Sequence, residues 1–214
     1  MAAVLLEGCP TAGRAVDLGC GTGLSAEPLT RRGWEVIGVD RSAAMLRRAT
    51  ARGRLTRSVL ADAAATELPG GWADLVLMNN LLHLCPQPAA VLAEARRLLA
   101  PGGRIVCVWP AETANFAEAR RADQLLGRLL PSLLLAATLR LVVGLAGFLT
   151  RARRWRSRHV TATVFDWAAS HGWVCPRDGV VCGVEQYVVL NRPACRAAEL
   201  IGSVPDGEFS PSTQ

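Results

Sequence analysis

The stretch "VDLGCGTG" at residues 16–23 has the composition of a loop that holds a nucleotide-like ligand. Glycines stand at alternate positions, Gly19, Gly21 and Gly23, and an apolar strand pattern leads into them. Glycine lets a ligand approach backbone N–H groups closely, because no Cβ stands in the way. An acidic residue, Asp17, lies two positions before the first glycine. The loop therefore predicts ligand binding, and its surroundings decide which ligand.

Polar residues recur at the ends of the next three strand-like segments. Asp40 ends "WEVIGVD", Asp62 ends "TRSVLAD", and Asn79 and Asn80 end "ADLVLMNN". In an open α/β sheet the ligand binds outside the carboxyl ends of the strands. A carboxylate at the second strand end can accept both hydroxyls of a ribose, and one at the third can accept from an adenine amino group. The set predicts a nucleoside site at this edge.

The spacing of the glycines separates two kinds of cofactor. A dinucleotide fingerprint has the spacing GxGxxG, whereas here the third glycine comes one place early and Leu24 takes its position. Asp17 would oppose a pyrophosphate and would suit a cation. An aminoacyl group with a positive amine, next to a sulfonium, fits this loop better than a nicotinamide dinucleotide does.

The elements that must position these residues alternate along the first half of the chain. Strands are predicted at 14–18, 34–40, 56–62, 73–80 and 104–110, and helices at 24–33, 42–52 and 88–103. Ser42 is a plausible N-cap of the second helix. A helix at 162–173 and an antiparallel hairpin follow. This order predicts an α/β, Rossmann-like, seven-stranded mixed sheet, mostly parallel, with helices on both faces.

In this order and spacing the chain resembles class I S-adenosylmethionine-dependent methyltransferases of the small-molecule type, similar to those of ubiquinone and menaquinone biosynthesis. The matching pieces are "VDLGCGTG", "VIGVDRS", "ADAAATELP", "ADLVLMNNLLHL" and "LLAPGGRIVCVWP". They cover about residues 14–110, and residues 161–191 match more loosely. The resemblance implies a methyltransferase with S-adenosylmethionine as its cofactor.

The resemblance also implies a role for each matched residue. Asp17, Gly19, Gly21 and Gly23 would contact the methionine end of the cofactor, Asp40 would hold the ribose, Asp62 and Ala63 would lie at the adenine, and Asn79 would lie near the methionine moiety. Two further residues bear on the acceptor, the molecule that would receive the methyl group. His83 is a candidate general base, although a packing role is the structural alternative. Trp109 is a candidate for the acceptor pocket and equally for the core.

Composition further narrows the class of protein and its expected ligands. Half of the 214 residues are hydrophobic, enough to bury a core. All 24 basic residues are arginine, so the net charge of +6 indicates compositional bias more than a nucleic-acid surface. Seven cysteines form no CxxC pair and no metal-ligand spacing with histidine, so we predict no metal and a reduced, cytoplasmic protein. The first residues do not have the pattern of a secretory signal.

Residues 111–159 depart from the resemblance. Positions 129–149 are apolar apart from Arg140, and the arginine-rich run "RARRWRSRH" follows at 151–159. The apolar run is nominally long enough to cross a bilayer, but a crossing would separate strands of one sheet. We therefore predict a lid over an apolar pocket, peripheral association with the inner face of the membrane through 129–158, or both. Each favours an apolar or lipid-like small molecule as the acceptor.

The predicted organisation is a single domain over 1–192, with 111–159 as a helical insertion and 193–214 as a poorly ordered tail. Only 13 residues precede the first strand, so we expect the cover that relatives place there to be short. Two alternative functions stay open at this point. One is a non-catalytic S-adenosylmethionine-binding partner subunit. The other is a nucleic-acid methyltransferase, which is disfavoured because "NNLLHL" stands where an (N/D)PP(Y/F) motif would. The oligomeric state is not predicted.

Overall fold

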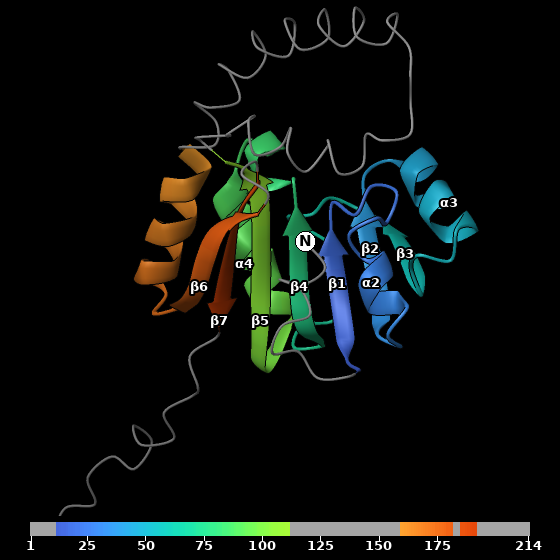
Figure 1. Cartoon of the computed structure of the whole chain (residues 1–214), viewed down its shortest axis with the longest axis horizontal. Helices are drawn as coiled ribbons and strands as arrows, with labels where there is room; N and C mark the ends of the chain where they lie inside the picture. Colours follow the sequence, from blue (N-terminus) through green and yellow to red (C-terminus); the bar gives the residue numbers. More distant parts are fainter. Residues whose placement is uncertain (1–11, 112–158, 182–184, 192–214) are drawn as a thin grey trace, which may run out of the picture.

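A seven-stranded mixed sheet organises the chain and confirms the predicted Rossmann-like fold (Figure 1). The computed structural model describes residues 12–111, 159–181 and 185–191. The strands are β1 (Arg14–Leu18), β2 (Glu35–Asp40), β3 (Arg57–Leu60), β4 (Ala73–Asn79), β5 (Leu99–Pro110), β6 (Val174–Val181) and β7 (Glu185–Asn191). Their order is β3-β2-β1-β4-β5-β7-β6, in which β7 runs antiparallel to both neighbours and the other pairs are parallel.

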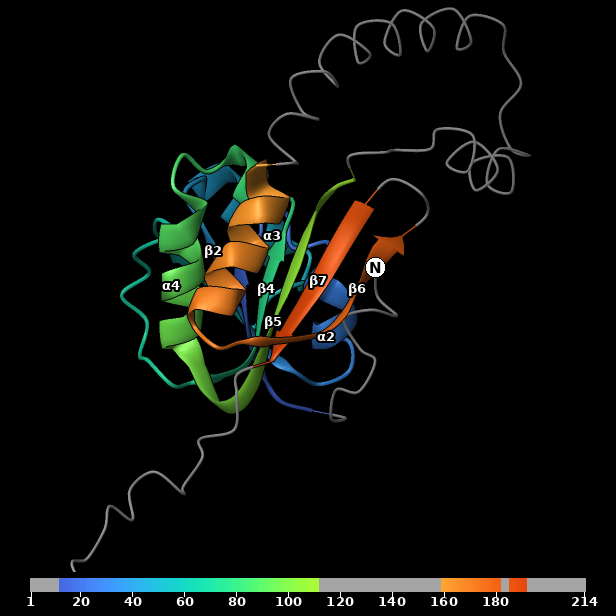
Figure 2. The same cartoon turned by 90° about the vertical axis from the view of Figure 1, so that its left-hand side faces the viewer.

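Helices cover both faces of this sheet. They are α2 (Glu27–Thr30), α3 (Ala43–Ala51), the 3-10 turn η1 (Leu82–Leu84), α4 (Pro88–Leu98) and a helix over 159–170. Side chains alternate along β1: Val16 and Leu18 pack in one core with α4 and the 159–170 helix, whereas Ala15 packs in a second core with α2 and α3. Figure 2 shows α4 and the 159–170 helix on the same side of the sheet.

Several predicted boundaries are wrong for local reasons. The helix expected at 24–33 is the single turn α2, which begins at Glu27 with a proline in its first turn and has no side-chain cap at Ala26. Strand β5 begins at Leu99, five residues before the predicted start, and a register irregularity opposite Ala73 and Leu75 accommodates the early pairing. The N-cap expected at Ser42 is confirmed, since its side chain accepts from the Met45 N–H at 3.4 Å.

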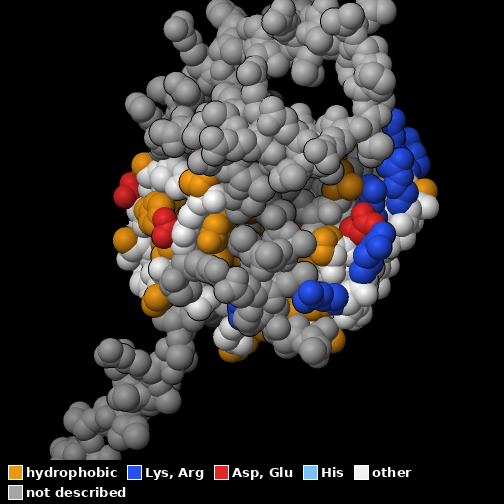
Figure 3. All heavy atoms as spheres, in the orientation of Figure 1, with side chains coloured by type: hydrophobic (Ala, Val, Ile, Leu, Met, Phe, Trp, Pro, Cys, Tyr) orange, Lys and Arg blue, Asp and Glu red, His pale blue; other side chains and the backbone are white. Residues whose placement is uncertain are grey.

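Arginine side chains gather on the solvent face of α3 and β3. Arg47, Arg48, Arg52 and Arg57 are exposed there, and the space-filling view shows basic side chains along that side of the molecule (Figure 3). In the described residues, salt bridges form elsewhere, so this group is a solvated face of an amphipathic helix.

The strand order reverses between β1 and β4, which marks the carboxyl ends of these strands as the expected ligand site. The predicted insertion at 111–159 lies outside the described residues except at its two ends, and the tail at 193–214 lies wholly outside them. Within the described ranges no helix has the length and hydropathy to cross a membrane, and the apolar run 129–149 is not part of those ranges.

Candidate active site

The glycine loop leaves β1 in a conformation that suits glycine. Gly19, Gly21 and Gly23 have φ values of 68°, 53° and 75°, in the left-handed region that other residues rarely adopt. A Cβ on Gly19 would lie 2.7 Å from Leu81 Cδ1, so a larger residue there would also have to displace the Leu81 side chain. The Gly21 N–H donates to Asp40 Oδ2 at 2.8 Å, which ties the loop to the end of β2.

Asp17 is buried at the end of β1 without a hydrogen-bond partner for either carboxylate oxygen. Its residue is 1% exposed, and its strand neighbours are Gly38 on β2 and Leu77 on β4. Burial raises the pKa of Asp17 to about 8, and the nearby Asp40 carboxylate contributes to the rise. A buried carboxylate with both oxygens unsatisfied is costly in a folded protein, and such groups mark functional sites.

Asp40 is fixed in place by backbone donors. Its Oδ2 accepts from the Gly21 N–H and its Oδ1 accepts from the Ser42 N–H, both at 2.8 Å. The residue is half-buried and lines a cavity, so the remaining lone pairs of the carboxylate can face a ligand. The geometry is suited to accepting hydroxyl donors from a sugar.

Asp62 lies two residues beyond the end of β3, not within that strand as predicted. Its Oδ1 accepts from the Ala64 N–H at 2.8 Å, and its Oδ2 lies 3.7 Å from the Arg41 guanidinium. Strand pairing with β2 ends at Leu60, so the chain turns away there and presents Asp62 at the sheet edge.

The loop after Asp62 is anchored by a buried carboxylate on α4. Glu94 Oε1 accepts from the Thr66 N–H at 3.0 Å and from the Thr66 hydroxyl, and both Glu94 oxygens accept from Arg97 at 2.7 Å. These bonds, led by those from Arg97, lower the pKa of Glu94 to about 2 although burial opposes the shift. The network therefore holds the loop that carries Asp62 against α4.

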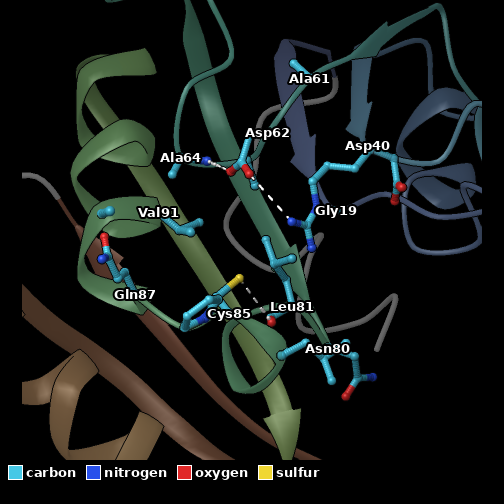
Figure 4. Close-up of a pocket in the computed structure, with 15 residues that line it drawn as sticks. Gly19, Asp40, Ala61, Asp62, Ala64, Asn80, Leu81, Cys85, Gln87 and Val91 are labelled. Carbon is cyan, nitrogen blue, oxygen red and sulfur yellow. Dashed lines mark hydrogen bonds and ion pairs between the residues drawn. The ribbon is translucent and has the colours of Figure 1, made fainter.

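A cavity of about 390 Å³ brings part of the predicted set together. Four predicted residues line it: Gly19, Asp40, Asp62 and Ala63. The rest of its lining is Arg41, Ala61, Ala64, Asn80, Leu81, Leu84, Cys85, Pro86, Gln87, Ala90 and Val91. In Figure 4 the carboxylates stand at the strand ends, while Gln87 and Val91 come from the start of α4. One wall is thus polar and acidic, and the other is largely apolar.

The remaining predicted cofactor residues lie outside this cavity lining. Asp17, Gly21 and Gly23 belong to the strand end and loop just described. The Asn79 amide donates to the Ser25 hydroxyl, which links the end of β4 to the turn after the glycine loop. Its neighbour Asn80 has a φ of 56°.

The two acceptor candidates differ in position. Trp109 is fully buried in the core that α4 covers, and its indole N–H donates to the Thr161 hydroxyl at 3.1 Å, which favours the core interpretation. His83 is buried in η1 and lines a second hollow of about 390 Å³. The other residues of that hollow are Leu82, Leu84, Cys85, Pro86, Pro88, His159 and Val160. The two hollows share the segment Leu84–Pro86 and so lie on either side of it.

The comparisons with known proteins agree with this geometry. Residues 16–107 match the family model described as a methyltransferase domain. The ubiquinone biosynthesis O-methyltransferase of Methylococcus capsulatus is 40% identical over 98 residues, which cover 43% of this chain and 41% of that relative. The trans-aconitate 2-methyltransferase of Methylobacterium radiotolerans is 42% identical over 103 residues, 47% of this chain and 39% of that relative. The chain thus spans about two fifths of the length of both curated relatives.

A solved structure of an S-adenosylmethionine-dependent methyltransferase from Mesorhizobium loti shares the fold. It covers 90% of this chain and 98% of its own, with a TM-score of 0.59 and 18% identity. The described residues thus have a fold that is also found in S-adenosylmethionine-dependent methyltransferases. Within that fold, residues 16–107 resemble a methyltransferase domain, and this resemblance implies S-adenosylmethionine as the cofactor. The predicted resemblance and cofactor are confirmed.

The residues of the site fit this cofactor. A buried carboxylate without a partner, Asp17, suits the ammonium of its methionine end. Asp40 offers a fixed acceptor for the ribose hydroxyls, and Asp62, which also lines the cavity, offers a second carboxylate for the adenine amino group. The apolar wall, which includes Leu81 and Val91, suits a flat base.

Sequence reasoning missed the residues that complete the cavity. Asn80 is predicted at the strand end but without a role, and Arg41 follows Asp40 directly, so position alone could have found both. Leu81, Cys85 and Val91 carry no motif, because they reach the cavity only when η1 and α4 pack beside the Asp62 loop.

Proposed function

We propose that this protein transfers the methyl group of S-adenosylmethionine to a small, apolar acceptor. The observation that carries the donor half is the acidic edge of the sheet. Asp17 is buried and unsatisfied, Asp40 is held by two backbone N–H groups, and Asp62 is held by a third. Three carboxylates at successive strand ends suit a ligand with an ammonium, a ribose and an adenine.

The acceptor half rests on the second hollow. Its lining is apolar apart from two imidazoles, and it lies next to the donor cavity across the segment Leu84–Pro86. Leu84 lines both hollows and is 61% exposed, so an apolar molecule there would gain contact with a side chain that otherwise faces water. The two relatives named above are a ubiquinone biosynthesis O-methyltransferase and a trans-aconitate 2-methyltransferase. The name of the ubiquinone relative favours an apolar acceptor, whereas the name of the trans-aconitate relative favours a polar one.

The chemistry asks little of the protein beyond positioning. The bound cofactor supplies a methyl group that is already activated, as a sulfonium. The chain must hold the acceptor atom in line with that methyl group and keep water out. His83 lines the acceptor hollow and is the candidate to accept a proton from a hydroxyl acceptor. If it does, His83→Asn should lower kcat and remove an acidic limb of its pH profile while donor affinity stays unchanged.

Labelled cofactor tests the proposal directly. The full chain is incubated with methyl-labelled S-adenosylmethionine and a lipid-rich host extract, and the products are separated and identified by mass. Label in an organic-soluble small molecule is the expected result. Asp40→Ala should abolish the transfer, while the matched control Asp74→Ala, at the opposite end of the sheet beside Arg14, should retain it.

Other outcomes separate the alternatives. Label found only in water-soluble products would contradict the apolar acceptor and leave the methyltransferase in place. Donor binding with no transfer to any fraction would support the non-catalytic partner subunit. Label in nucleic acid would support a nucleic-acid methyltransferase.

The membrane proposal concerns residues 129–158, which lie outside the described residues. Their apolar run and following arginines support docking to an anionic surface. Flotation of the full chain with anionic vesicles is expected, and it should weaken as salt is raised. A protein that stays at the bottom of the gradient with both anionic and neutral vesicles contradicts it.

A further inference from the structure

Asp17 and Asp40 place two carboxylates close together at the ends of β1 and β2. Asp40 uses both oxygens to accept backbone N–H groups, which stabilise its charge. Asp17 has neither a donor nor water-exposed oxygens. Ionising Asp17 in the empty site would therefore create a buried negative charge next to another one, with nothing to balance it.

Among the residues that the structure describes, no cationic group acts on Asp17 to offset that cost. The groups that face it are Asp40 from β2 and the Cys20 thiol from the glycine loop. Gly38 and Leu77 flank it on the two neighbouring strands, and neither bears a charge. Among the ion pairs of the described residues, none includes Asp17. The raised pKa of Asp17, about 8, agrees with this geometry.

We propose that Asp17 carries a proton in the empty site and exchanges it for the ammonium of the incoming cofactor, so that each cofactor bound releases about one proton. The carboxyl O–H bond breaks, the proton leaves to solvent, and the carboxylate pairs with the ammonium. This inference rests on the proposed cofactor and assigns Asp17 a role in selection: the site favours ligands that bring a cation to this position.

The exchange needs a small rearrangement. Asp17 does not line the donor cavity, but Gly19, two residues later, does. The Leu81 side chain packs against Gly19 and also lines the cavity. Val16 and Leu18 pack on the face that α4 covers, so Asp17 points to the opposite face, as Ala15 and its strand partner Leu77 do. A shift of the glycine loop is therefore the movement that would bring the carboxylate and the ligand's ammonium into contact. Such a shift is local, since the glycine loop directly follows the end of β1 at Leu18.

Calorimetry of the full chain measures the proton directly. S-adenosylmethionine is titrated at pH 7 in two buffers of different ionisation enthalpy, and the difference in heat gives the protons released. About one per site is expected. Affinity should also fall about tenfold from pH 7 to pH 6, as a single linked proton requires. The cofactor's own amino group stays protonated in this range, since α-amino groups have a pKa of about 7.7–8.0.

Two further ligands and one variant sharpen the test. S-adenosylhomocysteine keeps the ammonium and should release the same proton, whereas adenosine lacks it and should release none. Asp17→Asn should bind the cofactor more weakly, release no proton, and show no change in affinity between pH 6 and pH 7. The matched control, Asp74→Asn, should behave as the unmodified protein, because Asp74 pairs with Arg14 far from the site.

Each result decides something. Cofactor binding without proton release, or adenosine releasing as many protons as the cofactor, would overturn the exchange while leaving the methyltransferase proposal intact. If the folded protein bound no S-adenosylmethionine in either buffer, the proposed function and the exchange would both fail. Should Asp17→Asn not fold, the buffer comparison on the unmodified chain still decides the question.

Discussion

Replacing Glu94 by glutamine should destabilise the protein through the loop that carries Asp62. Glu94 is only 8% exposed, and it accepts from the Thr66 backbone, the Thr66 hydroxyl and Arg97. Glutamine preserves the size of the side chain but removes its charge and turns one oxygen into a donor that faces the guanidinium. The change therefore tests the network with little change of volume.

The magnitude follows from the pKa of Glu94. A fall from 4.5 to about 2 corresponds to about 3 kcal/mol, at about 1.4 kcal/mol for each pKa unit. The Arg97 side chain is 43% exposed, so solvent screening reduces its share. We expect Glu94→Gln to lower the free energy of unfolding at pH 7 by about 2 kcal/mol. Because the folded pKa lies below the unfolded one, this stability is present above about pH 4.5 and is lost as the pH falls toward 2.

Urea unfolding at several pH values measures both parts. The unmodified protein and Glu94→Gln should differ by about 2 kcal/mol at pH 7, and the difference should shrink steadily toward pH 2. The control is Glu35→Gln, an exposed glutamate on β2, which should leave stability unchanged. A difference that is the same at pH 7 and at pH 2.5 would refute the electrostatic reasoning and assign the loss to packing alone.

Three further changes test other parts of the structure. Gly19→Ala should abolish cofactor binding in calorimetry and lower stability by about 1–2 kcal/mol, because Gly19 has a positive φ and its new Cβ would meet Leu81. The control is Gly33→Ala, at a similar φ but with open space around the new Cβ, which should lower stability without affecting binding. Ser42→Ala should cost about 1 kcal/mol in thermal or urea unfolding through loss of the N-cap, and full stability in that variant would contradict the cap. The free energy of unfolding of Asp17→Asn without cofactor should exceed that of the unmodified protein by an amount that grows as the pH rises from 4 to 8. The reason is that the raised pKa of Asp17 makes its ionisation unfavourable in the folded state. A difference that does not change with pH would contradict this.

Most of the fold could be predicted because its signals are local. Apolar strands alternate with amphipathic helices, and Ser42 and the glycines punctuate them at the expected places. The boundaries that were wrong depend on distant partners. Strand β5 extends back to Leu99 because β4 offers Ala73 as a partner across a register irregularity, and a window of the sequence does not contain that pairing.

The sequence by itself determined where the candidate cofactor residues stand. Gly19, Asp40 and Asp62 each stand at or just after a strand end, and parallel pairing brings strand ends to one edge whatever the loops between them do. The spacing of the glycines and the presence of Asp17 were enough to favour S-adenosylmethionine over a dinucleotide.

Only the tertiary structure decided how these residues are charged and enclosed. Two aspartates with similar sequence surroundings differ because Asp40 meets two backbone donors and Asp17 meets none, and hydrogen-bond partners are a property of the packed chain. The apolar wall likewise arises where η1 and α4 pack against the Asp62 loop, which Glu94 anchors. Burial and partner geometry depend on contacts between distant segments, so they follow from the fold and not from the local pattern of residues.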